Sequence, residues 1–215
     1  MVFYFTPRRN EEGYLLYMGK DKFENEDLIR HSLPIDIWFH VDNLSSAHVY
    51  LRLPLGVSLD AIDPEPLEDA AQLVKANSIQ GCKLNNVDVV YTPAANLHKS
   101  ASMEVGQVGF KNEKQVKKTT VAKKSNDIIN RLNKTKKETQ PDLEGEREAW
   151  EREQRGRAKA EAVARAQQAK AEREQNKKLE ELKSYKSVMK DEDMVTVKDL
   201  RQKYATPEDY EDDFM

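Results

Sequence analysis

The chain has 215 residues, of which 34% are charged and 38% are apolar. Because globular domains carry about 25% charged residues, this composition favours a smaller folded part with a long solvated extension over one compact domain. No apolar run reaches the ~18 residues of a membrane-spanning helix, and the single cysteine, Cys82, excludes an internal disulfide framework and a cysteine-rich zinc site.

The net charge of −3 hides a strong segregation of charge along the chain. Residues 111–140 hold ten basic and three acidic side chains, whereas residues 1–110 hold nine basic and fifteen acidic ones. Charges are screened beyond about 8–10 Å in physiological salt, so phosphate attraction depends on the local excess rather than on the total. A net acidic chain of this kind can therefore still bind nucleic acid.

The first 122 residues predict an α+β domain with a mixed, mostly antiparallel sheet and two or three helices. Alternating β-branched and aromatic residues indicate strands, and apolar residues spaced by three and four indicate helices. In chain order, we expect strand 1–6, strand 14–18, helix 21–31, strands 37–41 and 47–53, helix 64–78, strand 87–92, and a hairpin of strands 105–110 and 115–122.

Beyond residue 122 the sequence becomes strongly charged. Residues 123–140 predict a basic helix or linker, helical over 125–138. Residues 141–190 are rich in Ala, Glu, Lys, Arg and Gln, which favour a long helix. This helix lacks the repeated apolar positions of a strong coiled coil, so we expect a single helix or a weak coiled coil; a partly disordered segment is the alternative. Residues 191–215 predict an acidic, disordered tail.

The sharpest functional pattern lies in the strand pair 37–41 and 47–53. Side chains of a strand alternate between two faces, and one face of each strand here is purely apolar. The five-residue connection sets a register that opposes side chains about 4.5–5.5 Å apart on the other face. The opposed pairs are His40 with His48, Trp38 with Tyr50, and Asp36 with Arg52.

A solvent-facing patch of rings, imidazoles and a guanidinium is typical of single-stranded nucleic acid binding. Basic side chains near it could hold phosphates. The alternative is that a helix, such as 64–78, covers this face and makes Trp38 and Tyr50 part of a second core, while the lysines form a solvated surface or a nuclear-import signal. The candidate nucleic-acid-binding residues are Trp38, His40, His48, Tyr50, Arg52, Lys20, Lys111, Lys117, Lys118, Lys123 and Lys124.

Catalysis is the competing hypothesis for the same segment. His40, Asp42, two serines and His48 include the residue types of a nucleophilic triad, but no strand–turn–helix nucleophile elbow surrounds the serines. The alternative function is a hydrolase of RNA-linked esters or phosphodiesters, with His40 and His48 as acid and base and Asp42 beside them. We expect no metal and no cofactor, since His-x-Asp-x5-His is no strong metal signature.

Several motifs in order resemble the NFACT-R module of ribosome-quality-control factors. They are Asp36-Ile37-Trp38-Phe39-His40-Val41 with Ala47-His48-Val49, Gly19-Lys20-Asp21 with Asn25-Glu26, Val89-Val90-Tyr91-Thr92, and Gly106-Gln107-Val108. The resemblance covers residues 1–122. With the long charged helix, the whole chain is similar to the coiled-coil domain-containing protein 25 family, whose members carry this module alone.

The resemblance implies nucleic acid binding, with RNA favoured and DNA possible, on or near His40, His48 and Arg52. It also implies a link to translation or ribosome quality control. The resulting hypothesis is a nucleic-acid-binding adaptor, more plausibly not an enzyme, with a protein partner along residues 141–190. We expect it in the cytoplasm, the nucleus or both, without a membrane span.

Overall fold

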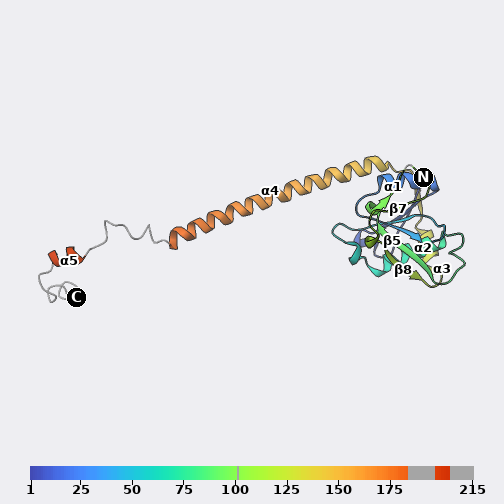
Figure 1. The fold of residues 1–215 in the computed structure, drawn as a ribbon, viewed down its shortest axis with the longest axis horizontal. Coiled ribbons are helices and arrows are strands. Elements are labelled where there is room, and N and C mark those ends of the chain that lie inside the picture. Colours follow the sequence, from blue (N-terminus) through green and yellow to red (C-terminus); the bar gives the residue numbers. More distant parts are fainter. Residues whose placement is uncertain (101, 184–196, 204–215) are drawn as a thin grey trace. The chain divides into compact units, whose positions relative to one another are not determined.

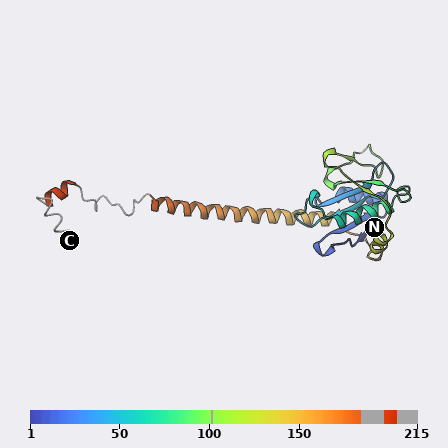
Figure 2. The same ribbon diagram turned by 90° about the horizontal axis from the view of Figure 1, so that it is seen from below.

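The structure is a computed structural model that describes residues 1–100, 102–183 and 197–203 (Figure 1). The chain divides into two compact units, Met1–Glu153 and Gln154–Met215. The described helices include α4 (Leu143–Lys183), which begins in the first unit, and α5 (Val197–Lys203) in the second. Figure 2 shows α4 as one unbroken helix. None of the helices in the described part of the chain has the length and apolarity needed to cross a bilayer.

The first unit has an α+β fold built on a seven-stranded sheet in the order β8-β5-β3-β4-β2-β1-β9, and every pairing in it is antiparallel. A short hairpin, β6 with β7, forms a second sheet. The strands are β1 (Val2–Phe5), β2 (Leu15–Gly19), β3 (Asp36–Val41), β4 (Val49–Arg52), β5 (Val87–Pro93), β6 (Leu97–His98), β7 (Gly109–Phe110), β8 (Lys117–Val121) and β9 (Lys137–Thr139).

One face of the sheet packs against α2 (Pro64–Ala76) and α3 (Asn126–Lys134). Strand alternation sends Ile37, Phe39 and Val41 of β3 to this face, where all three are buried. The prediction that these side chains face the core is confirmed. The buried side chains that the sheet contributes to this layer are apolar. The layer is therefore stabilised by the removal of apolar surface from water.

The opposite face of the sheet is also covered. Its layer consists of α1 (Lys22–His31), the segment 94–116 without residue 101, which carries β6 and β7, and the first residue of α4, Leu143. Trp38 and Tyr50 belong to this second core. The sheet therefore lies between two covering layers, and the cover over Trp38 is not the helix 64–78 that the sequence alternative suggested.

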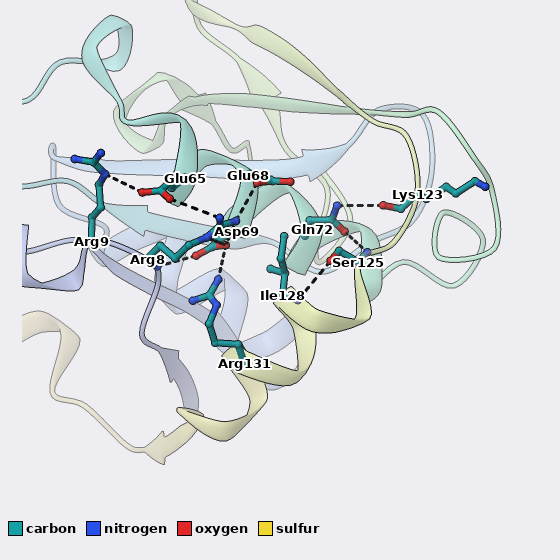
Figure 3. A network of polar contacts seen from close by, with 10 residues as sticks. All are labelled: Arg8, Arg9, Glu65, Glu68, Asp69, Gln72, Lys123, Ser125, Ile128 and Arg131. Atoms are coloured by element: carbon teal, nitrogen blue, oxygen red, sulfur yellow. Dashed lines mark hydrogen bonds and ion pairs between the residues drawn. The ribbon is translucent and has the colours of Figure 1, made fainter.

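A polar network ties α2 to the chain on both sides of it (Figure 3). The fully buried Asp69 of α2 accepts hydrogen bonds from the backbone N–H of Arg8 at 2.8 Å and from Nη2 of Arg131 at 2.6 Å. Gln72 bonds the backbone of Lys123 and Ser125 at the start of α3. These contacts, with the pairing of β9 to β1, make residues 123–140 part of the folded unit rather than a linker.

Four predicted elements differ from the structure or extend beyond its described residues. The hairpin of 105–110 with 115–122 is wrong, because β7 pairs with β6 whereas β8 pairs with β5. Helix 125–138 ends at Lys134, and β9 follows it. The helix predicted over 141–190 is described only to Lys183. The tail predicted as disordered contains α5, and the rest of it lies outside the described residues.

Candidate nucleic-acid interface

The predicted register of β3 and β4 is confirmed. Asp36 pairs with Arg52 and Trp38 with Tyr50, and the ring centroids of His40 and His48 lie 5.0 Å apart. The expectation that the rings face solvent is wrong, however: Trp38 is 2% exposed and Tyr50 is fully buried. The alternation of a strand fixes which residues share a face, but it does not say what another segment places over that face.

Trp38 organises the two histidines. Its Nε1–H donates to Nδ1 of His48 at 2.8 Å, so a neutral His48 ring carries its proton on Nε2, where it bonds the backbone of Gly106. The ring of His40 stacks in parallel on Trp38 at 5.5 Å between centroids, and its Nδ1 donates to the Val41 carbonyl at 2.7 Å.

Both imidazoles are neutral at pH 7. Burial, followed by the charge of His40 nearby, lowers the pKa of His48 to about 3. Burial also lowers the pKa of His40, against the opposing effect of hydrogen bonds to the backbone of Val41 and Ser46. The two rings therefore offer no positive charge to a phosphate near neutral pH, and their contribution is shape and hydrogen bonding.

His40 and His48 line an open pocket of about 820 Å³. This volume falls within the roughly 300–1,000 Å³ of typical small-ligand sites. The pocket gathers four segments that are separate in sequence: the turn from β2 into α1, the end of β3, the approach to β4, and the loop 104–107. The residues that line it are Gly19, Lys20, Asp21, Lys22, Asn25, His40, Ser45, Ser46, Ala47, His48, Glu104, Val105, Gly106 and Gln107.

The turn from β2 into α1 sets the near wall of the pocket. A Cβ on Gly19 would lie 3.0 Å from the backbone nitrogen of Asn25, which is tighter than most Cβ contacts, so glycine favours this close approach. The side chain of Asp21 caps α1 by accepting from the backbone N–H groups of Phe23 and Glu24. This cap places Lys20 and Lys22 on the exposed rim.

Asn25 is the buried polar residue of the pocket wall. It is 5% exposed, and its Oδ1 accepts from the Tyr50 hydroxyl at 3.0 Å. Its Nδ2 has no hydrogen-bond partner among the described residues. Sequence reasoning assigned Lys20 to the site but missed Lys22 and Asn25, although the Gly19-Lys20-Asp21 and Asn25-Glu26 motifs pointed to this turn.

The far wall is the loop 104–107, which is held in place by a half-buried ion pair between Lys99 and Glu26. Lys99 donates to Glu26 Oε1 at 2.9 Å and to the carbonyls of Glu104 and Gln107, and the same Oε1 accepts from the Gly106 N–H at 2.7 Å. Gly106 has a φ of 89°, a left-handed conformation that favours glycine. The Gly106-Gln107-Val108 motif was therefore a signal for this wall.

The other predicted binding residues lie outside the lining of this pocket. Arg52 makes a two-point contact with the buried Asp36, with Nε–Oδ1 at 2.9 Å and Nη2–Oδ2 at 3.3 Å. Burial by itself lowers the pKa of Arg52, but the hydrogen bond and the negative charge of Asp36 raise this pKa by more. Arg52 thus serves the sheet interior, and Tyr50 contributes through its bond to Asn25.

The five lysines predicted after residue 110 are dispersed over the surface. Lys117 pairs with Asp60, and Lys118 pairs with Asp42 at 2.6 Å. Lys111 donates to the carbonyl of Ala95 at 2.8 Å. Lys123 and Lys124 are exposed in the connection from β8 to α3. Although these lysines are close together in the sequence, none of them lines the pocket with His40 and His48.

The geometry gives no support to the hydrolase hypothesis. Nδ1 of His48 is occupied by Trp38 and Nδ1 of His40 by a backbone carbonyl. Asp42 is paired with Lys118 rather than with either imidazole. Within the described ranges, no three His, Cys, Asp or Glu side chains form a group that could hold a metal ion.

Residues 1–112 match the family model described as the NFACT protein RNA binding domain, NFACT-R. The chain therefore belongs to the NFACT-R family. Over 93% of its length it is 56% identical to coiled-coil domain-containing protein 25 of Bos taurus, of which it covers 96%. A homologue of that protein in Dictyostelium discoideum is 52% identical over 72% of this chain and 74% of its own.

A solved structure shares the fold. It is the C-terminal part of the fibronectin/fibrinogen-binding protein from Streptococcus suis, with a TM-score of 0.50 and 23% identity over 60% of this chain and 48% of that chain. The family resemblance inferred from the sequence motifs is confirmed by the family model and by the relatives of Bos taurus and Dictyostelium discoideum. Three of the four motif groups that carried it contribute residues to the pocket lining, and the fourth, Val89-Val90-Tyr91-Thr92, lies in β5 beside β3.

Proposed function

We propose that the Met1–Glu153 unit binds RNA through the rim and walls of the pocket between the start of α1, His40, the approach to β4 and the loop 104–107. The observation that carries this proposal is the convergence of separate family motifs on one open, polar pocket. The family model's RNA-binding description and the lysines at the mouth support RNA as the ligand. DNA is the second candidate polymer, because phosphate contacts do not distinguish the two.

Within this proposal the residues have different roles. Lys20 and Lys22 contact phosphates at the rim, since both are exposed and line the pocket mouth. The Asp21 carboxylate beside them is engaged with the first turn of α1, which offsets its charge. His40 and His48 shape the floor, and Trp38, Tyr50 and Arg52 hold that floor from inside the second core.

The lysines on β8 and after it form a separate, outer candidate contact. Lys117 and Lys118 already hold carboxylates, so a phosphate would have to displace Asp60 or Asp42. Lys123, Lys124 and Lys111 are exposed and could add contacts on a long RNA. We place their contribution below that of the pocket rim.

The wider role that we propose is that of an adaptor. α4 beyond Gln154 exposes its side chains along most of its length, and it offers a charged surface to a protein partner. With an RNA-binding unit at one end, such a chain suits a task linked to translation or ribosome quality control, in the cytoplasm, the nucleus or both.

Fluorescence anisotropy of the full chain with a structured RNA that ends in a single strand tests the proposal. We expect affinity to fall steeply with salt, with a slope of about −0.7 per contacted phosphate on single strands. The double variant Lys20→Gln, Lys22→Gln should weaken binding and flatten this slope. The matched control Lys117→Gln, Lys118→Gln should change both much less, and an equal or larger effect of the control would contradict the proposed site.

A further inference from the structure

The pocket separates charge from buried polarity. Its four charged lining residues, Lys20, Asp21, Lys22 and Glu104, are exposed. The buried lining residues Asn25 and His48 carry an amide and a neutral imidazole. A phosphate placed deep in the pocket would lose its hydration without meeting a buried cation, which is costly. The interior is therefore suited to a neutral polar group, and the rim to an anionic one.

Asn25 has an unused donor. Its Oδ1 is bound by the Tyr50 hydroxyl, while Nδ2 is buried without a partner among the described residues. A buried N–H that makes no hydrogen bond costs free energy, so native structures pair nearly all of them. Asn25 lines the pocket, so the missing acceptor can be supplied from that side when a ligand displaces the atoms that cover Nδ2.

The floor of the same pocket has an aromatic surface. The ring of His40 lines it and is held flat on Trp38, with an interplanar angle of 2°. Rings held in this way give bases a surface on which to stack. A nucleobase combines a π-face with edge acceptors, whereas a sugar or a phosphate offers no such face.

We infer that the pocket receives the base of one unpaired nucleotide, with Asn25 Nδ2 donating to an acceptor on the base edge and Lys20 and Lys22 holding the flanking phosphates. This inference rests on the proposed function and narrows it to single-stranded ends, loops or bulges. A base within a duplex cannot enter, since its edge is paired and its faces are stacked.

Two RNAs with identical phosphates test the inference. One is a hairpin with a four-nucleotide 3′ overhang, and the other carries the same overhang with abasic nucleotides. With the full chain we expect the abasic RNA to bind about tenfold or more weakly, the order of effect that loss of base contacts gives. Equal affinities would overturn the inference. Failure of both RNAs to bind would instead contradict the proposed function on which it rests.

Two matched variants assign the effect to Asn25. Asn25→Ala removes the unused donor together with the bond to Tyr50, whereas Tyr50→Phe removes that bond alone. We expect Asn25→Ala to reduce the preference for the base-bearing RNA to the part that stacking on His40 supplies, and Tyr50→Phe to keep the preference in full. If Asn25→Ala keeps the full preference, Asn25 does not contact the base. The wild-type comparison does not depend on how well either variant folds.

Discussion

The two faces of the central sheet bury different kinds of side chains. Beneath α2 and α3 the sheet buries aliphatic and aromatic side chains such as Phe39 and Leu51. Beneath α1 and the segment 94–116 it buries rings with polar atoms and charged groups, among them Asp36 and His48. The second face costs more to desolvate, and the pocket opens on that side. The apolar face therefore provides stability, and the polar face is the one on which we propose that RNA binds.

The largest expected effect comes from the buried carboxylate of the polar face. Asp36→Ala leaves Arg52, the Tyr17 hydroxyl and the Leu33 N–H without their acceptor. Breaking a buried ion pair in this way should lower the free energy of unfolding by about 3–5 kcal/mol. Urea denaturation measures this loss. A change below about 1 kcal/mol would mean that the polar face is not an integral part of the core.

A truncation on the apolar face provides the comparison. Leu51→Ala, beneath α2, should cost about 2–5 kcal/mol through lost apolar burial and the cavity left behind. The same denaturation series measures it. RNA affinity of the folded variant should stay unchanged, because Leu51 faces away from the pocket. A loss of affinity with retained folding would show that the two faces are not independent.

Acid should destabilise the polar face in particular. The folded-state pKa of His48 is about 3 against an ordinary 6.5, so the unfolded chain binds the proton first. The contribution of His48 to the free energy of unfolding is therefore fully present above about pH 6.5 and is lost as the pH drops towards 3. Between pH 7 and pH 5 this loss is about 2 kcal/mol. His40 acts in the same direction. Unfolding free energies of His48→Gln should show a flatter profile over this range, and identical profiles would contradict the assignment.

The smallest effect on stability is expected at the rim. Lys20→Gln and Lys22→Gln change exposed side chains, so the free energy of unfolding should move by no more than about 0.5 kcal/mol. Differential scanning calorimetry checks this. Any loss of RNA affinity in these variants then reports on binding alone, whereas a large drop in the unfolding temperature would make the rim part of the scaffold.

The sequence predicted those parts of the fold that depend on local alternation. The pairing of Asp36 with Arg52 followed from strand periodicity and loop length, because a one-residue slip would bury the wrong face. The segment that covers Trp38 could not be predicted in the same way, because the strands of residues 94–116 are only two residues long and show no alternation. Strand β9 also escaped prediction: its three exposed residues pair with β1 through the backbone and show no apolar pattern.

Part of the pocket lining was also predicted from the sequence. His40, His48 and Lys20 were identified from motifs that do meet at the pocket. Lysines 111–124 were grouped by their closeness in sequence, but β8 lies at the sheet edge and its lysines hold carboxylates there. Asn25 stood in one of these motifs but was not identified as a site residue, because an unpaired amide becomes visible only when its partners are known in three dimensions.

Nuclear magnetic resonance of the full chain, titrated with the overhang RNA, tests the central claim most directly. The account predicts that the largest shifts occur at the side-chain amide of Asn25 and at the backbone amides of Lys22 and Gly106, around the pocket. Shifts confined to Lys117, Lys118 and the connection to α3, with the pocket unmoved, would contradict it.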